Sequence, residues 1–197
     1  MAPHGVAETV VAHVRFLLLL AAALLQLLLC AGAAQGAADE AVAERRVKAA
    51  YLYRFAGYVT WPDGVFATPD APLAIGIWGN DGLAEDLAAL VQSRTIDNRR
   101  IEVRRVREPE SLAGLHVLFV SHARNARLAE AALGGQSRAT LVVTETPGAL
   151  KQGSAINFVV VDGQVRFELS PEAAEKHGLK LSSRLIAVGI GATEKAR

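Results

Sequence analysis

Residues 73–91 read LAIGIWGNDGLAEDLAALV, and this stretch decides the fold class. Its first part, Leu73–Trp78, has the short apolar composition of a β-strand. Turn-forming residues follow at Asn80-Asp81-Gly82, and leucines then recur at helical spacing as far as Val91. The stretch therefore predicts one strand followed by one helix, which is the repeating unit of α/β folds.

Three more strands are predicted downstream, at 101–106, 117–120 and 140–144. The run at 117–120 is continuously apolar, which is typical of a central strand covered on both faces. A helix at 125–133 is expected between the last two strands. Together these elements predict an α/β fold: a Rossmann-like three-layer domain with a mostly parallel sheet and right-handed crossovers.

A helix is also expected before this unit, from Ala41 to the Trp61-Pro62 dipeptide. Proline disfavours a helical conformation of the residue before it, so Pro62 marks the predicted helix end. Tyr51, Phe55 and Tyr58 share one face of this helix and are predicted core residues.

The C-terminal third predicts a β-hairpin, because two apolar stretches, 155–161 and 164–169, flank Asp162-Gly163. This two-residue turn sets the register and places Phe158 opposite Phe167. The same register pairs Val161 with Gln164, Val160 with Val165, Val159 with Arg166 and Asn157 with Glu168. Ser170 and Ser182 are the predicted N-caps of two short helices, the second reaching Ile190.

The composition excludes two classes of protein. The chain has 197 residues, 51% hydrophobic and 21% charged, with 21 basic and 20 acidic side chains and a net charge of +1. Such a balance argues against a polyelectrolyte that binds nucleic acid and against wholesale disorder.

The N-terminus resembles a secretory leader. Arg15 precedes the apolar run Phe16–Leu29, and small residues follow it at 31–34. We expect residues 1–37 to be a cleaved signal peptide and 38–197 to be a single exported domain. An uncleaved membrane anchor and a later start codon are the alternatives. Cys30, the only cysteine, would leave with the leader, so the mature domain would have no thiol.

Motifs for catalysis or cofactor binding are weak. The glycines after the first strand have the spacing G-x-x-G-x-x-G, and Trp78 fills a position that should be tight, so a nucleotide site is disfavoured. The histidines of the mature domain lack metal-ligand spacing, and neither a metal nor a cofactor is expected. Ser121-His122 ends the central strand, but no nucleophile elbow surrounds it, so a hydrolase is the weakest hypothesis.

Two groups of side chains are candidates for binding. Tyr53, Arg54 and Trp61 could form a stacking surface on the first helix. Arg166 and Glu168, two residues apart on one face of the hairpin, form either a surface ion pair or a charged patch that orients a partner.

An ordered set of segments resembles the YfiR-like family of periplasmic proteins from about Val47 to Ile190. The segments are VKAAYLYRF with Trp61-Pro62, LAIGI with Gly79, VLFVS, Gly153 to Val160, VRFE and LKLSSRL. The resemblance implies a non-enzymatic α/β domain that represses an inner-membrane diguanylate cyclase by binding its periplasmic sensory part. It also implies a homodimer and relief of repression by an outer-membrane lipoprotein. Disulfides that some members carry are impossible in this mature domain.

Partner or ligand binding is accordingly expected at eight positions: Tyr53, Arg54, Trp61, Asn157, Arg166, Glu168, His177 and Arg184. The alternative function is a small-ligand sensor that feeds a sensor histidine kinase. Its pocket would combine Arg54, Trp61, Arg166, Glu168 and His177, provided that the last helix folds back on the hairpin.

Overall fold

The computed structural model describes residues 36, 38–107, 112–124 and 139–190. The chain divides into two units, Met1–Ala43 and Glu44–Arg197. In the first unit, residues 36 and 38–43 are helical. None of the helices in the described ranges has the length and apolar character needed to cross a membrane.

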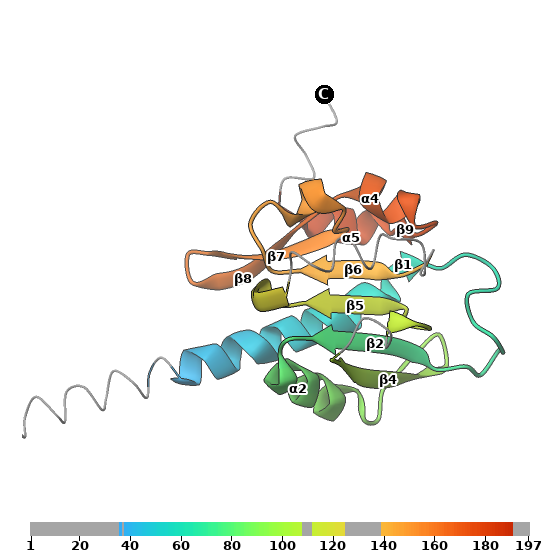
Figure 1. The fold of residues 1–197 in the computed structure, drawn as a ribbon, viewed down its shortest axis with the longest axis horizontal. Helices are drawn as coiled ribbons and strands as arrows, with labels where there is room; N and C mark the ends of the chain where they lie inside the picture. Colours follow the sequence, from blue (N-terminus) through green and yellow to red (C-terminus); the bar gives the residue numbers. More distant parts are fainter. Residues whose placement is uncertain (1–35, 37, 108–111, 125–138, 191–197) are drawn as a thin grey trace, which may run out of the picture. The chain divides into compact units, whose positions relative to one another are not determined.

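The second unit contains a seven-stranded sheet with the order β3-β4-β2-β5-β6-β7-β8 (Figure 1). Five neighbouring strands, β4, β2, β5, β6 and β7, run parallel, and the strands at the two ends pair antiparallel. The strands span Leu73–Trp78 (β2), Thr95–Ile96 (β3), Arg99–Val106 (β4), Val117–Val120 (β5), Leu141–Thr144 (β6), Ile156–Val161 (β7) and Gln164–Leu169 (β8). The predicted α/β fold with a mostly parallel sheet and a C-terminal hairpin is confirmed.

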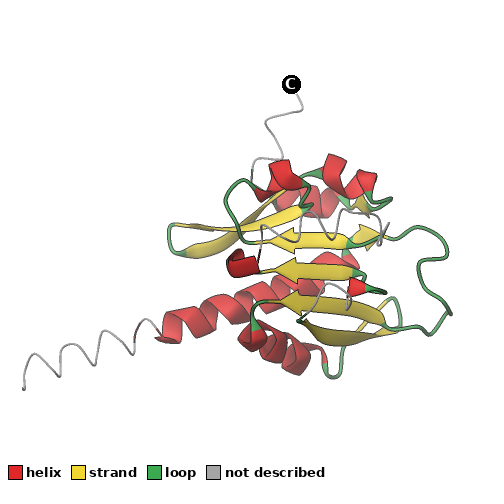
Figure 2. Cartoon of the chain, in the orientation of Figure 1, coloured by secondary structure: helices red, strands yellow, loops and turns green. Residues whose placement is uncertain are grey.

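Side chains are buried on both faces of the central strands. On one face, Leu73, Ile75 and Ile77 belong to the main core cluster, together with Phe55 from the helix that ends at residue 57. Figure 2 shows helix α2 (Asp81–Val91) beside the sheet, and its residues Leu83, Leu87 and Val91 belong to the same cluster. On the other face, a smaller cluster contains Ala74, Trp78, Leu118 and Val120. This two-sided burial explains why these strands have continuous apolar sequences.

The hairpin forms in the predicted register. All the expected pairs occur, from Val161 opposite Gln164 to Asn157 opposite Glu168, with Phe158 opposite Phe167. Asp162 and Gly163 have φ angles of 50° and 70°, the left-handed values that a tight hairpin turn requires. Phe167 meets Phe55 edge-on, with ring centroids 4.9 Å apart, so the inner hairpin face is anchored to the N-terminal helix.

The first helix ends earlier than predicted. It stops at residue 57, and Val59–Thr60 (β1) pairs antiparallel with Lys180–Leu181 (β9) in a separate two-stranded sheet. Tyr58 and Trp61 therefore do not lie on the helix, and Tyr58 is 38% exposed instead of being a core residue. The β-branched residues Val59 and Thr60 favour a strand once a partner strand is present.

The C-terminal elements follow their predicted caps. Ser170 caps α4 (Pro171–Lys176), and Ser182 caps α5 (Ser183–Val188). Ile190 was predicted on the last helix, but its N–H donates to the Phe167 carbonyl of β8 instead. The helix predicted at 125–133 lies outside the described residues.

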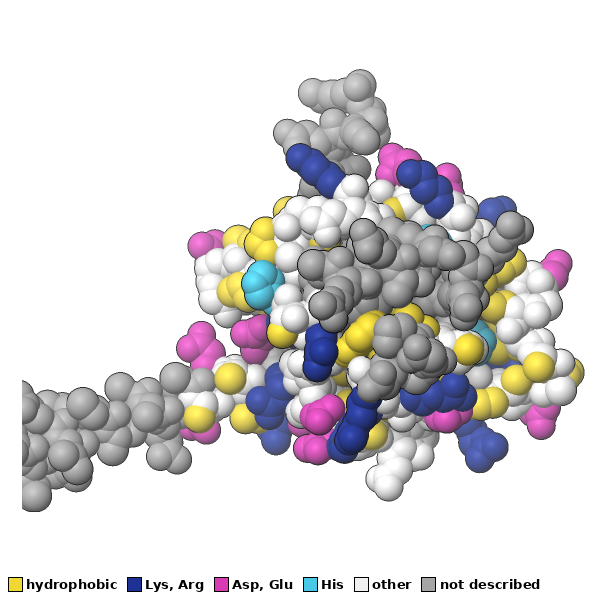
Figure 3. All heavy atoms as spheres, in the orientation of Figure 1, with side chains coloured by type: hydrophobic (Ala, Val, Ile, Leu, Met, Phe, Trp, Pro, Cys, Tyr) yellow, Lys and Arg dark blue, Asp and Glu magenta, His cyan; other side chains and the backbone are white. Residues whose placement is uncertain are grey.

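The described surface carries mixed charge. Basic and acidic side chains are interspersed on the face shown in Figure 3. Strand β4 contributes pairs such as Arg104 with Glu102 and Arg105 with Glu85, both partly exposed. The arginine-rich sequence of this strand therefore does not form a uniformly basic patch.

Candidate functional site

The structure distributes the eight predicted binding residues over several places. Asn157, Arg166 and Glu168 share the outer face of the hairpin, where Asn157 and Glu168 are a cross-strand pair. Tyr53 and Arg54 lie on the first helix, and the Tyr53 hydroxyl is 3.4 Å from the Thr95 carbonyl. The other three lie apart from these: Trp61 after β1, His177 at the end of α4 and Arg184 on α5.

Asn157 holds Glu168 in place on the hairpin. The Asn157 side chain is fully buried, and its Oδ1 accepts from Thr144 Oγ1 at 2.8 Å and from the Thr146 N–H at 2.9 Å. Its Nδ2 donates to Glu168 Oε1 at 2.9 Å. Because hydrogen-bonded buried groups have few alternative positions, Asn157 holds the Glu168 carboxylate in a fixed position.

Arg166 does not form the ion pair with Glu168 that the sequence offered as one alternative. Its Nη2 donates to Gln164 Oε1 at 2.6 Å, along the same strand. The Arg166 side chain is exposed, and therefore its charge remains available to solvent.

A buried lysine lies at the carboxyl ends of the strands. Lys48 is 7% exposed, and its ammonium donates to Glu145 Oε2 at 2.7 Å and to Glu44. Burial by itself lowers the pKa of Lys48, but the hydrogen bonds and charges of Glu145 and Glu44 outweigh it and raise the pKa above 10.5. Lys48 is therefore firmly cationic at neutral pH.

Glu145 connects this lysine to β5 and β7. Its Oε1 accepts from the His122 N–H at 3.2 Å, and His122 Nδ1 lies 3.3 Å from Thr146 Oγ1. The Thr146 N–H in turn bonds to Asn157. A continuous polar network thus runs along this edge from the first helix to Glu168.

A cavity of about 650 Å³ opens beside this network. Its lining residues include the glutamates Glu44, Glu145 and Glu168 and the lysine Lys48, together with the apolar residues Phe158 and Val160. Three glutamates and one lysine among the lining residues give them a net negative charge, which favours a cationic group. We call this the carboxyl-edge cavity.

Most residues of the carboxyl-edge cavity were not predicted from the sequence. Glu44 and Lys48 have the i, i+4 spacing of a helix-surface ion pair, which was a detectable signal. Glu145 is 97 residues from Lys48 along the chain, and no local pattern links the two. Of the predicted residues, only Glu168 lines this cavity directly.

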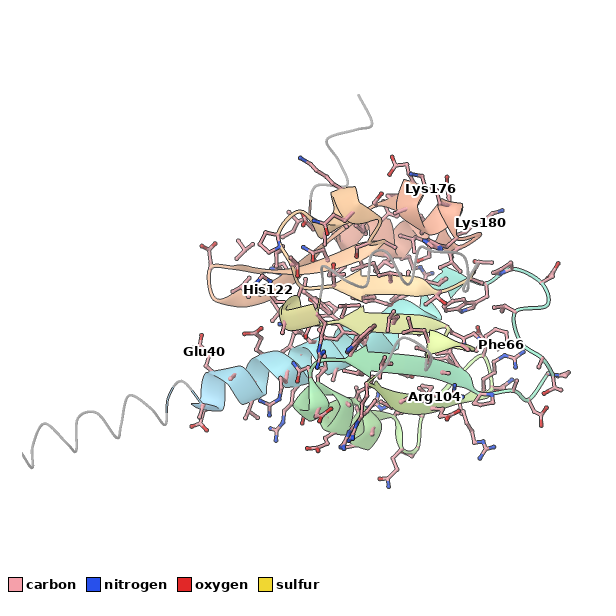
Figure 4. The ribbon with its side chains drawn as sticks, in the orientation of Figure 1. Glu40, Phe66, Arg104, His122, Lys176 and Lys180 are labelled. Atoms are coloured by element: carbon pink, nitrogen blue, oxygen red, sulfur yellow. The ribbon has the colours of Figure 1, made fainter. Side chains whose placement is uncertain are left out.

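The opposite edge of the sheet has an aromatic cluster. Phe66 stacks on His116 with ring centroids 4.4 Å apart, and Trp61 meets His116 edge-on at 5.8 Å. Arg99 places its guanidinium carbon 3.8 Å from the Phe66 ring centroid. Figure 4 labels Phe66 and His122 at opposite ends of the central strands.

His116 is neutral in this cluster. Burial, followed by the charges of Arg104 and Arg99, lowers the pKa of His116 below its ordinary value, and a bond to the Val65 backbone offsets this only in part. Its Nδ1 accepts from the Ala74 N–H at 3.1 Å, which a protonated ring could not do.

A second cavity, of about 730 Å³, lies at this amino edge. Trp61, Phe66, Asp97 and Arg99 are among its lining residues. The Trp61 Nε1 atom is buried, and no described residue accepts a hydrogen bond from it. We call this the amino-edge cavity.

The composite ligand pocket suggested by the sequence is not assembled. Trp61 lines the amino-edge cavity, whereas Glu168 lines the carboxyl-edge cavity. The chain after α5 does return to the hairpin, because the Ile190 N–H bonds to Phe167, but this does not bring Trp61 nearer.

The geometry at Ser121 and His122 does not match a nucleophile and its base. Ser121 Oγ is buried without a hydrogen-bond partner in the described ranges, and the His122 ring faces Thr146. Among the same residues, no group of three His, Cys, Asp or Glu side chains is placed to hold a metal ion.

Comparison with known proteins identifies one family. A family model described as YfiR/HmsC-like matches residues 45–189. This range includes every described strand and all the lining residues of both cavities except Glu44. No curated protein matches the chain.

Proposed function

The chain belongs to the YfiR/HmsC-like family, and from this premise we propose that it is a non-enzymatic periplasmic regulator. It binds the periplasmic sensory part of an inner-membrane diguanylate cyclase and represses it, so that it controls cyclic di-GMP. Residues 1–37 are the proposed cleaved signal peptide, and residues 38–197 are the regulatory domain. Homodimerisation and relief by an outer-membrane lipoprotein are further parts of the proposal, taken from the family resemblance.

One observation carries the proposal: a preorganised surface at the end of the hairpin. Glu168 is fixed by the buried Asn157, and Val160, another lining residue of the carboxyl-edge cavity, is 58% exposed. Exposed apolar side chains next to fixed charges are typical of protein interfaces, where rigid groups lose little conformational entropy on binding. The excess negative charge of the cavity favours a basic side chain of the partner.

The test separates the charge of Glu168 from its structural bond. Glu168→Lys is expected to raise cyclic di-GMP in a deletion strain complemented with the variant. Glu168→Gln keeps an acceptor for Asn157 Nδ2 but removes the charge, and it is expected to derepress the cyclase without lowering the melting temperature. Both should also reduce co-purification of the membrane partner.

Glu175→Lys on α4 is the matched control, because Glu175 is exposed and lies outside both cavities. It is expected to behave like the wild type. If both Glu168 variants repress fully while the protein stays folded, the hairpin surface is not where the partner binds.

A small-ligand sensor that feeds a sensor histidine kinase is the second candidate function. The amino-edge cavity favours it, because Trp61 Nε1 is a buried donor with no acceptor among the described residues and lies near the stacked Phe66 and Arg99. Thermal melting with aromatic amino acids and nucleotides tests it, since a ligand that binds only the folded state raises the melting temperature. An unchanged melting temperature at millimolar ligand would remove its support.

A further inference from the structure

A second polar site lies where the strand order reverses. The chain passes from β2 through α2 to β4 on one side and then returns to β5 on the other side of β2. In open parallel sheets, ligands bind at the carboxyl ends of the strands at such a switch point. Here the switch point contains the turn Gly79-Asn80 after β2, and Ser121, which follows β5.

The N-terminus of α2 leaves donors free at this point. Asn80 Oδ1 accepts from the Leu83 N–H at 2.9 Å, and the Asn80 carbonyl accepts from the Ala84 N–H. The N–H groups of Asp81 and Gly82 precede the first intrahelical bond, and no other described residue accepts from them. Free N–H groups at the start of an 11-residue helix favour an anion.

Ser121 provides independent support. The residue is only 4% exposed, and its Oγ is buried with no hydrogen-bond partner among the described residues. The hydroxyl points at the turn, because a Cβ on Gly79 would lie 2.2 Å from Ser121 Oγ. Burying a hydroxyl without a hydrogen-bond partner costs free energy, unless a ligand or a water molecule forms the missing hydrogen bond.

Two arginines flank the same turn. The Arg124 side chain passes over Gly79, with its Cγ 2.8 Å from the position of the missing Cβ. Arg45 Nε is 2.9 Å from the corresponding position at Gly82 and also bonds to Asp86. Within the described ranges Arg124 forms no ion pair.

The glycines have different roles from those that the sequence spacing suggested. Gly76 lies inside β2, where a Cβ would lie 2.4 Å from Leu115 Cδ1, so it is needed for packing. Trp78 points into the second core cluster and does not obstruct the turn. Gly79, with a φ of +85°, and Gly82 are the two that admit Ser121 and Arg45 to the turn.

We propose that this turn, with Ser121 Oγ, Arg124, Arg45 and the free N–H groups of α2, is a binding site for a tetrahedral oxyanion such as phosphate or a phosphate monoester. The site is distinct from the carboxyl-edge cavity and does not depend on the proposed repression. The exposed carboxylate of Asp81 lies in the first turn of α2 and opposes an anion, which keeps the affinity modest.

Isothermal titration with inorganic phosphate, at constant ionic strength maintained with chloride, tests the proposal on the purified mature protein. A 5′-mononucleotide is titrated in a second arm, and binding of the nucleotide alone would identify a phosphate monoester as the ligand. Saturable binding in either arm is expected. Absence of binding in both arms at millimolar concentration would overturn the proposal.

Three variants locate the site. Ser121→Ala removes a hydroxyl that has no described partner, so the fold should persist while phosphate affinity falls by about threefold to tenfold. Arg124→Gln should weaken binding by a similar factor, and Asp81→Asn should strengthen it. Arg100→Gln at the start of β4 removes the same charge at the opposite edge and should bind like the wild type. If Ser121→Ala and Arg124→Gln bind as the wild type does, phosphate binds elsewhere and the assignment is wrong.

Discussion

The two edges of the sheet stabilise a cationic side chain by different means: Lys48 is buried, whereas Arg99 is only partly buried. At the carboxyl edge, Lys48 is surrounded by the carboxylates of Glu145 and Glu44, and its charge is matched by opposite charges. At the amino edge, Arg99 lies over the Phe66 ring and donates to the backbone carbonyls of Thr68 and Ala71, and among the described residues it has no carboxylate in a salt bridge. Loss of a single charge should therefore lower the stability of the protein most at the carboxyl edge. At the amino edge, stability should be lowered by adding a charge.

The largest expected effect on stability is that of replacing Lys48. Replacing it in Lys48→Met leaves Glu145, whose side chain is only 15% exposed, without its cation. Removing one partner of a buried pair is costly, so we expect the free energy of unfolding to fall by about 3 kcal/mol, measured by urea denaturation. Lys151→Met, at an exposed lysine of the 3-10 helix Ala149–Gln152, is the control and should change stability by less than about 0.5 kcal/mol. Equal effects of the two variants would show that the charge network adds nothing.

A smaller loss of stability is expected when Arg99 is replaced. Arg99→Met removes the guanidinium from the Phe66 ring and two hydrogen bonds, at 3.0 Å to Thr68 and 2.9 Å to Ala71. No buried carboxylate is left behind, and we expect a loss of about 1–2 kcal/mol by the same denaturation measurement. The exposed neighbour Arg100 provides the control Arg100→Met. A loss as large as that of Lys48→Met would remove the distinction between the two edges.

The smallest expected effect on stability appears only at acidic pH and depends on His116. Its folded-state pKa lies below the unfolded value of 6.5, so the unfolded chain binds the proton first. Stability should therefore be full above about pH 6.5 and should decline as the pH falls below that value, until the folded pKa is passed. Denaturation curves between pH 7.5 and 5.5 measure this slope.

His116→Asn provides the comparison for this slope, because Asn Oδ1 can accept from the Ala74 N–H but does not titrate. Its stability should change less over the same interval. At the carboxyl edge the sign is opposite: the raised pKa of Lys48 gives a contribution that persists below pH 10.5 and is lost only at higher pH. Parallel acid slopes in the wild type and His116→Asn would contradict the neutral, buried histidine.

Local sequence predicted the fold well wherever neighbouring residues decide the conformation. The hairpin register follows from Asp162-Gly163, since a two-residue turn leaves only one pairing. Strand β2 has the predicted bounds, because Leu73–Trp78 is apolar and ends at turn residues. The end of the first helix could not be found in this way, because Val59 and Thr60 become a strand only by pairing with residues 180–181.

In the candidate site too, features that depend on local sequence were predicted, and features that depend on tertiary contacts were not. Asn157 and Glu168 were identified from the sequence, because they are opposite each other across the predicted hairpin. Trp61 was assigned to the wrong element, and its neighbour His116 is 55 positions away in the numbering. The partners of Lys48 and the convergence of Ser121 with Gly79 could not be predicted, since they lie on elements that meet only in the folded sheet.

By itself, the sequence determined the class of fold, the approximate places of the six longer strands and the hairpin register, because periodicity and turn chemistry act over a few residues. Only the tertiary structure decided where charges meet: Lys48 with Glu145, Arg99 with Phe66, and Ser121 with the turn before α2. The physical reason is that burial and Coulomb energies depend on distances between atoms in space, and sheet topology sets those distances across separations of tens of residues.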